Sequence, residues 1–470
     1  MMKGLFELAQ VSSYQPVADG FSSELLGMVG AGYGRDEALG MWVASGRSVD
    51  SFRHAYKKLK DRLLKEAFAK KNGLAFIQHK RMECWERFQK VKCLLIADKR
   101  VMAMELAGET LRYAQKYGLT EIVLSLSAQL EFYFGAINPD TRRYLRYRKI
   151  RKDAAREVSL EQDARGLYTC LIFYARLDKD WESLRPEVEK LEKSMASSVR
   201  FIVLRCNVLV AWYELLGDIK KMVAVVKDSI QMINKTADDS PHAALVNRYL
   251  QLLPILTAQK KFAEAESYLS ESLGLPDEGS YTWHQLMLQK AYLGFHSGKP
   301  KMALAAWQQA SKHKKHSTPL IDERWYIVRA YLAIYEKLGH LAVDGKPFRL
   351  ARFLNSVRFA STEKQLDNVA ILIVQMLHYL LDGKKKDYMH RADNVSNYMA
   401  HNLRGKEHIR CRCMLYMLKK VEEGDYYRLR SELRAKKWRR LLGKNPPTMS
   451  SEREILPYEM IWKLVLGQLK

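Results

Sequence analysis

The chain has 470 residues and a mass of 54.5 kDa; 47% of its residues are hydrophobic and 28% are charged. Both fractions lie near the average of globular proteins, which excludes a wholly disordered or fibrous chain. The 78 basic residues exceed the 53 acidic ones, giving a formal net charge of +25. Such a charge favours acidic partners, among them nucleic acids, anionic lipids and acidic protein surfaces.

The N-terminal segment, residues 1–66, begins with no apolar region of the kind that a secretory signal needs. Its glycines at 27, 30, 32 and 34 do not match a dinucleotide-binding fingerprint, because Arg35 stands where the third glycine is required. We interpret them as a turn. A short helix is predicted over residues 36–45, and a longer one from Ser48 or Asp50 to near Lys70.

The longer helix has two distinct faces. Its predicted buried stripe consists of Phe52, Tyr56, Leu59 and Leu63, and its opposite face carries Arg53, Lys57, Lys58, Lys60 and Arg62. A short helix, a tight turn and a basic helix resemble the DNA-contacting segment at the start of some bacterial winged-helix regulators. The segment also resembles the openings of uncharacterised bacterial repeat proteins. A DNA-contact helix and an N-terminal cap with a solvated basic face both stay open.

Residues 67–445 show an internal repeat of helical segments. Apolar residues recur every three or four positions, which predicts an all-α fold. Breaks between the amphipathic segments are predicted at Asp98, Asn138, Asp178, Gly217, Lys260, Gly298, Gly345, Gly383 and Gly424. Their mean spacing of about 41 residues predicts an array of about nine stacked helical hairpins.

Small residues recur at fixed distances from these breaks. After Gly298 follow Ala303, Trp307 and Ala310; after Lys260 follow Ala265, Leu269 and Ser272; and after Asp98 follow Ala103, Ala107 and Thr110. In this pattern the chain resembles the tetratricopeptide repeat family, which implies a right-handed α-solenoid. Small residues at a crossing let two helices approach closely.

Two basic runs lie within the repeat region. The first contains Arg142, Arg143, Arg146, Arg148, Lys149, Arg151 and Lys152, and the second contains Arg434, Lys436, Lys437, Arg439 and Arg440. Tyr144, Tyr147 and Trp438 are interleaved with them. Such runs can bind an acidic protein surface or nucleic acid, or they can be solvated helix faces.

Residues 446–470 are predicted to form a C-terminal capping helix that begins near Pro457. The longest apolar run, residues 369–381, is too short for a membrane span, which needs roughly 20 residues, so we interpret it as a buried helix. Six scattered cysteines match no zinc site or disulfide framework, and a reducing cytoplasm is expected.

Catalytic signatures are missing from the sequence. We find no phosphate-binding loop, no nucleophile elbow and no histidine pair at zinc-binding spacing, so no catalytic, cofactor-binding or metal-binding residues are predicted. We expect a non-enzymatic scaffold that binds a protein or peptide partner. The alternative is a nucleic-acid-linked regulator whose basic N-terminal helix contacts DNA while the repeats sense a partner.

Overall fold

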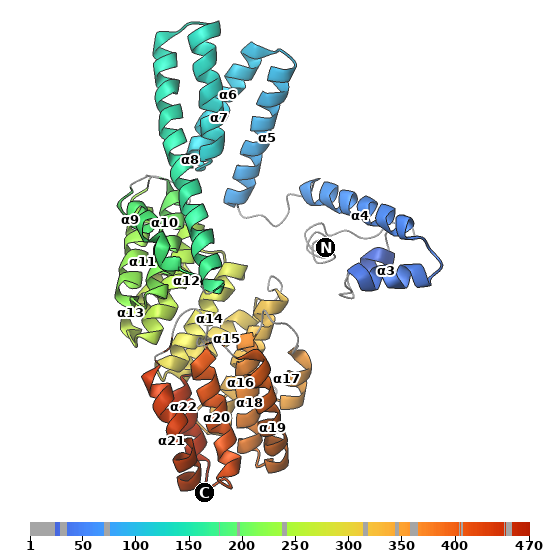
Figure 1. Cartoon of the computed structure of the whole chain (residues 1–470), viewed down its shortest axis with the longest axis vertical. Helices are drawn as coiled ribbons and strands as arrows, with labels where there is room; N and C mark the ends of the chain where they lie inside the picture. Colours follow the sequence, from blue (N-terminus) through green and yellow to red (C-terminus); the bar gives the residue numbers. More distant parts are fainter. Residues whose placement is uncertain are drawn as a thin grey trace. The chain divides into compact units, whose positions relative to one another are not determined.

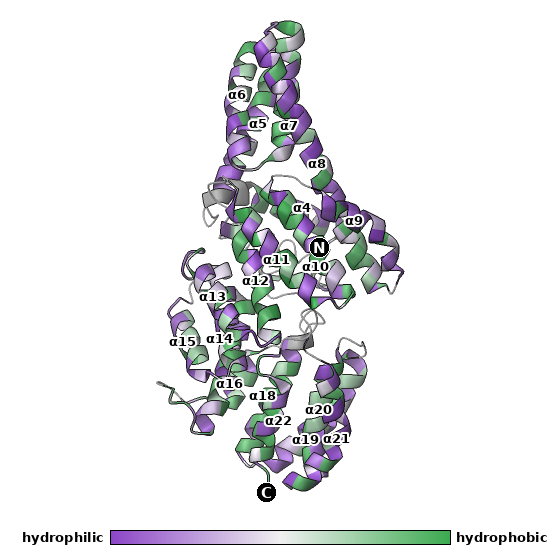
Figure 2. Ribbon diagram, turned by 90° about the vertical axis from the view of Figure 1, so that its left-hand side faces the viewer, coloured by the Kyte–Doolittle hydropathy of each residue, from purple (hydrophilic) through white to green (hydrophobic). Residues whose placement is uncertain are grey.

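The protein is all-helical over the residues that its computed structural model describes, namely 24–28, 35–69, 76–177, 179–194, 198–236, 242–313, 318–343, 347–357, 365–403, 405, 408–445, 447 and 454–470. No β-strand occurs within these ranges, so the predicted all-α fold class is confirmed. Neighbouring helices pack in pairs (Figure 1). Most helices carry both hydrophobic and hydrophilic residues along their length (Figure 2), as expected of amphipathic helices.

Contacts divide the chain into two compact units, Met1–Lys152 and Asp153–Lys470. The first unit contains α3 (Arg35–Ala44), α4 (Val49–Ala69), α5 (Phe76–Ile96), α6 (Arg100–Lys116), α7 (Thr120–Phe132), the π-helix η1 (Tyr133–Ile137) and the start of α8 (Thr141–Arg176). The sequence-based division at residues 66 and 445 stays a prediction.

The second unit continues from α8 to the last helix. Its elements are η2 (Trp181–Leu184), α9 (Arg185–Lys193), α10 (Val199–Leu215), α11 (Ile219–Asn234), α12 (His242–Ala258), α13 (Phe262–Leu273), α14 (Tyr281–His296), α15 (Pro300–Ser311), α16 (Pro319–Lys337), α17 (Leu350–Ser356), α18 (Gln365–Leu381), α19 (Lys385–Asn402), α20 (Ile409–Glu423), α21 (Arg428–Lys444) and α22 (Tyr458–Gly467). The apolar run at 369–381 is the buried helix α18, as expected.

Most helical pairs reverse direction through the same backbone turn. A residue with positive φ follows the first helix, and the N–H of the next residue donates to the carbonyl five positions earlier, as in a Schellman motif. Lys261, for example, donates to the Leu256 carbonyl at 2.9 Å. The positive-φ positions of these turns are Asp98, Gly118, Gly217, Lys260, Gly298, Gly339, Gly383 and Asp425.

The turns agree with five of the predicted breaks, at Asp98, Gly217, Lys260, Gly298 and Gly383. Asp178 and Gly345 lie outside the described residues, as do Gly30, Gly32, Gly34 and Lys70 of the N-terminal segment. Asn138 stands between η1 and α8 without a left-handed turn.

At the last break the left-handed turn lies directly after the predicted residue. Gly424 has a φ of −90°, and the left-handed conformation falls on Asp425 and Tyr426. A Cβ at Gly424 would lie 2.7 Å from the backbone nitrogen of Ser431. Gly424 therefore serves the close approach of α20 and α21 rather than the turn.

The close crossing of α14 and α15 has a similar origin. Ala303, predicted as a small crossing residue, is fully buried, and a Cβ at Gly294 would lie 2.8 Å from its backbone nitrogen. The sequence pattern identified Ala303 but not its partner Gly294. The pair shows why bulky residues are excluded where these two helices meet.

Helix α8 departs from the regular hairpin pattern. A regular array would place a turn between Asn138 and Asp178, but a single helix of 36 residues fills this interval. Between Thr141 and Arg176 the sequence has no proline and one glycine, Gly166, so nothing in it breaks the helix. The boundary between the two units falls within α8.

A buried ion-pair network holds the C-terminal segment of the second unit. Arg410, at the start of α20, donates to the carboxylates of Glu454 and Glu459 and to the carbonyl of Asn445. Burial opposes the charge of Arg410, but the Glu454 carboxylate raises its pKa. His296 of α14 donates from Nε2 to the Glu454 carbonyl at 2.6 Å. The segment before α22 is thereby joined to helices distant in the sequence, while α22 packs against α20 and α21.

The Lys260 turn gives a test of backbone strain in the array. A side chain in the left-handed conformation costs roughly 1–2 kcal/mol, so Lys260→Gly should raise the free energy of unfolding by about 0.5–1 kcal/mol. Lys260 is exposed and has a φ of 60°. Urea unfolding followed by circular dichroism measures the change.

The neighbouring residue supplies the matched control. Lys261 is equally exposed but has a φ of −83°, which lysine adopts without strain, and it stands at the N-cap of α13, where glycine is tolerated, so Lys261→Gly should change stability by only about a few tenths of a kcal/mol. Equal destabilisation by both substitutions would contradict the assignment of the turn.

Candidate partner-binding surface

The predicted basic residues lie on three helices. Those of the first run occupy the N-terminal turns of α8, those of the second run lie on α21, and the proposed DNA-contact residues lie on α4. Most of these side chains are exposed; Arg62 and Arg151 are half-buried. The first run lies in the first unit and the second in the second unit, and each is described separately.

One end of the first unit exposes several large apolar side chains. Helices α5 and α7 end here, and α6 and α8 begin here after short turns (Figure 1). The exposed residues are Ile96, Val101, Met102, Phe132, Ile137 and Leu145, with exposed fractions from 41% to 87%. Together with the basic residues of α8 we call this surface the tip patch. An apolar patch rimmed by charged residues is typical of a binding surface.

The π-helix η1 positions the aromatic residues of the tip. Phe134 on η1 is buried and stacks on Tyr147 of α8, with ring centroids 5.8 Å apart and an interplanar angle of 16°. Gly135 faces Tyr144, where an added Cβ would lie 3.0 Å from the ring. Single-turn π-helices occur frequently at functional sites, because they change the direction in which neighbouring side chains point.

Asp140 fixes the start of α8. Its Oδ1 accepts the backbone N–H of Arg143 at 2.9 Å, which caps the helix, and its other carboxylate oxygen forms an ion pair with the Arg143 side chain at 3.4 Å. The Arg143 guanidinium lies 5.0 Å from the centroid of Phe134. The cap and this cation–π contact hold the first basic turn of α8 against η1.

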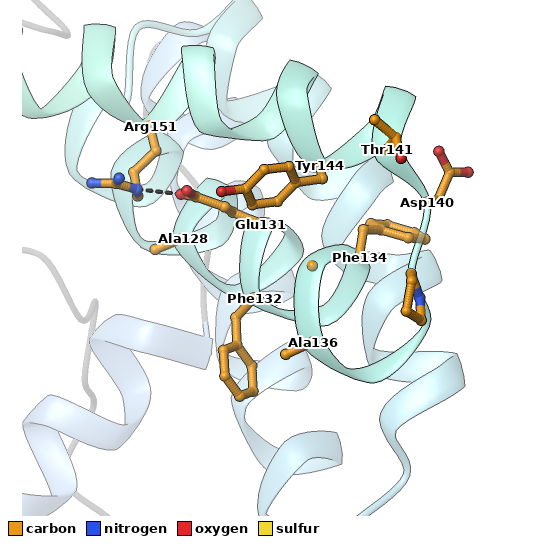
Figure 3. A pocket seen from close by; sticks show the side chains of 11 residues that line it. Ala128, Glu131, Phe132, Phe134, Ala136, Asp140, Thr141, Tyr144 and Arg151 are labelled. Carbon is orange, nitrogen blue, oxygen red and sulfur yellow. Dashed lines mark hydrogen bonds and ion pairs between the residues drawn. The ribbon is translucent and has the colours of Figure 1, made fainter.

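A pocket of about 570 Å³ lies between α7, η1 and the first turns of α8 (Figure 3). Tyr144 reaches from α8 toward η1, between Phe134 and the ion pair of Arg151 with Glu131. The Glu131 carboxylate raises the pKa of Arg151. Aromatic carbon forms much of the wall, and Arg151 and Glu131 close one side.

A second pocket, of about 600 Å³, also has Phe134 in its lining. Val101 and Met104 of α6 line it together with Tyr133, Arg143 and Arg146. It links the two hairpin turns, near Asp98 and Asn138, that form this end of the unit. The tip therefore offers two hollows, and Phe134 lines both of them.

The cations of the tip differ in how they are neutralised. Arg143 and Arg151 form ion pairs, and Arg148 donates to the Tyr144 hydroxyl at 3.2 Å. Arg142 and Lys149 are exposed and form no ion pair with any residue that the structure describes. These two charges are available to an acidic partner.

Helix α4 has the two faces that the sequence predicts. Phe52, Leu59 and Leu63 are buried with Trp42 of α3, and Tyr56 is half-buried. The Ser48 hydroxyl caps the helix by accepting the Ser51 N–H at 3.1 Å, and Gly46 forms the preceding turn with a φ of 82°. Lys57 and Lys60 point to solvent on the other face. The order of short helix, tight turn and basic helix is confirmed.

The described part of the chain holds no group of three or more histidine, cysteine or carboxylate side chains that could bind a metal ion. Within the same residues, no helix combines the length and the apolar character needed to cross a bilayer. Cys84, Cys206, Cys411 and Cys413 are buried, and burial raises the pKa of Cys84 to about 11.

Comparison with known proteins finds no protein family and no curated protein that matches the chain.

Sequence analysis found the basic residues of the tip but missed its apolar ones. Met102 and Phe132 are 30 positions apart in the sequence and lie at the same end of the unit because two successive hairpins turn there. The 40-residue spacing of the breaks at Asp98 and Asn138 was the signal that could have shown this.

Proposed function

We propose that the protein is a non-enzymatic scaffold that binds an acidic protein partner through the tip patch. The observation that carries the proposal is the joint presence of exposed apolar side chains and unpaired cations around two hollows. Apolar contacts supply affinity, and the cations Arg142 and Lys149 select an acidic surface and speed association.

The proposal includes the array itself. We infer a right-handed, tetratricopeptide-like α-solenoid of about nine hairpins, interrupted by the long helix α8. The recurring left-handed turns and the close crossing of α14 and α15 support this inference. The scattered positions of the six cysteines in the sequence support a reducing compartment, and we propose the cytoplasm.

Two double variants test the tip patch. Met102→Ser/Phe132→Ser removes side chains that are 58% and 64% exposed, and Arg142→Glu/Lys149→Glu reverses two exposed charges. Each should reduce partner capture by about tenfold or more, because interface energy is concentrated in few residues. Tagged full-length protein, crosslinked in its own cell lysate at several salt concentrations and analysed by quantitative mass spectrometry, gives the measurement.

Matched controls separate binding from general effects of polarity and charge. Phe173→Ser/Met389→Ser changes comparably exposed apolar residues, and Lys220→Glu/Lys301→Glu makes the same change in net charge elsewhere. Both should capture the partner normally. The proposal fails if the controls lose as much as the tip variants, or if the wild-type protein captures nothing above background.

The second candidate function is DNA binding by α4. The exposed Lys57 and Lys60, on a helix that follows a short helix and a tight turn, favour it. Wild-type protein should then bind duplex DNA in a filter assay at about 50 mM salt, where counterion release favours binding most, and Lys57→Glu/Lys60→Glu should weaken binding at least about tenfold. Absence of binding by the wild-type protein under these conditions excludes this function.

A further inference from the structure

The outer face of α21 carries features that the packing of the second unit does not use. The inner face is buried through Ser431, Ala435 and Leu442, and Trp438 stacks on Tyr416 of α20 with centroids 4.1 Å apart. The helix is thus firmly attached by one side. Helical periodicity places Leu429, Leu433, Lys436, Arg440 and Lys444 on the opposite side.

The first half of this outer face is apolar. Leu429 and Leu433 are 76% and 71% exposed, four residues apart, and Tyr427 beside them is 47% exposed. Burying a leucine side chain is favourable, and the described fold leaves this stabilisation unused at both positions. Two leucines at this spacing form a ridge that fits the groove of another helix.

The second half of the face is cationic. Arg430, Arg434 and Arg439 form ion pairs with Asp425, Glu423 and Glu432. Lys436, Arg440 and Lys444 are exposed and form no ion pair with any residue that the structure describes. The flanking arginines are therefore partly neutralised, while the cations in line with the leucines are not.

These charges select the occupant of the face. A second copy of the chain would bring two surfaces of like charge together, and the whole protein carries a net charge of +25. An acidic surface complements the lysine and arginine side chains, and an apolar ridge complements the leucines. An amphipathic helix presents both at the required spacing of three and four residues.

We propose that the outer face of α21 docks an acidic amphipathic helix of a partner protein. Leu429 and Leu433 pack into the apolar stripe of that helix. Lys436, Arg440 and Lys444 pair with its carboxylates. This surface lies in the second unit and uses none of the residues of the tip patch, so variants distinguish the two.

A synthetic helix tests the proposal. The probe is a fluorescein-labelled peptide of about 18 residues with leucine at every third or fourth position and glutamate on both flanks. Fluorescence anisotropy with the full-length protein should show binding that weakens as salt rises.

Two double variants of α21, Leu429→Ser/Leu433→Ser and Lys436→Glu/Arg440→Glu, should each raise the Kd by about tenfold or more. The matched control Leu177→Ser, at a 52% exposed leucine, should leave the Kd unchanged.

Three further results would overturn the proposal. The first is absence of binding to the acidic probe by the wild-type protein, and the second is an equal Kd for the wild type and both α21 variants. The third is that the α21 substitutions leave the peptide Kd unchanged but abolish binding to phosphatidylserine-containing vesicles, or abolish self-association measured by sedimentation velocity. A probe with lysine in place of glutamate should not bind. The tip variants should bind the acidic probe normally, so failure here leaves the tip proposal to its own test.

Discussion

Each helical pair of this protein depends on its neighbours, because a pair of short amphipathic helices has apolar surface on two flanks and can bury it only against adjacent pairs. The second unit shows this directly: residues of α14, α16, α18 and α20 belong to one continuous hydrophobic cluster. The left-handed turns and the small residues at the crossings serve this constraint, since they let successive helices reverse within a few residues and approach closely. Stability is thus distributed along the chain rather than concentrated in one centre.

The same constraint explains where the two proposed binding surfaces lie. Stacking buries the flanks of the helices. The ends of hairpins and the outward faces of helices at the surface stay exposed. In the first unit the ends of two hairpins combine apolar side chains, two hollows and unpaired cations at the tip patch. In the second unit the outer face of α21 combines Leu429 and Leu433 with cations. We propose acidic proteins as partners, because their charge complements that of these two surfaces.

Sequence alone predicted the features that depend on local chemistry. The turns at Asp98, Gly217 and Gly298 were recognisable because a left-handed backbone conformation favours Gly or Asp. The buried face of α4, with Phe52, Leu59 and Leu63, was recognisable from its helical periodicity. Features that depend on residues distant in the sequence were missed. Gly294 is needed only because Ala303 crosses it, and the ion pair of Arg151 with Glu131 forms only because α7 and α8 run side by side. The π-helix η1 leaves no compositional signal, although it positions the aromatic residues of the tip.

The most direct test of the account compares two fragments of the second unit by circular dichroism and thermal melting. Residues 281–313 contain one pair, α14 and α15, and residues 242–343 add the pair of α12 and α13 before it and the single helix α16 after it. We predict that the shorter fragment has little helix and no cooperative transition, because isolated helices of about 12–15 residues are marginal in water. The longer fragment should be helical and melt cooperatively. A shorter fragment that folds by itself with a sharp transition would contradict the claim that neighbouring pairs supply each other's stability.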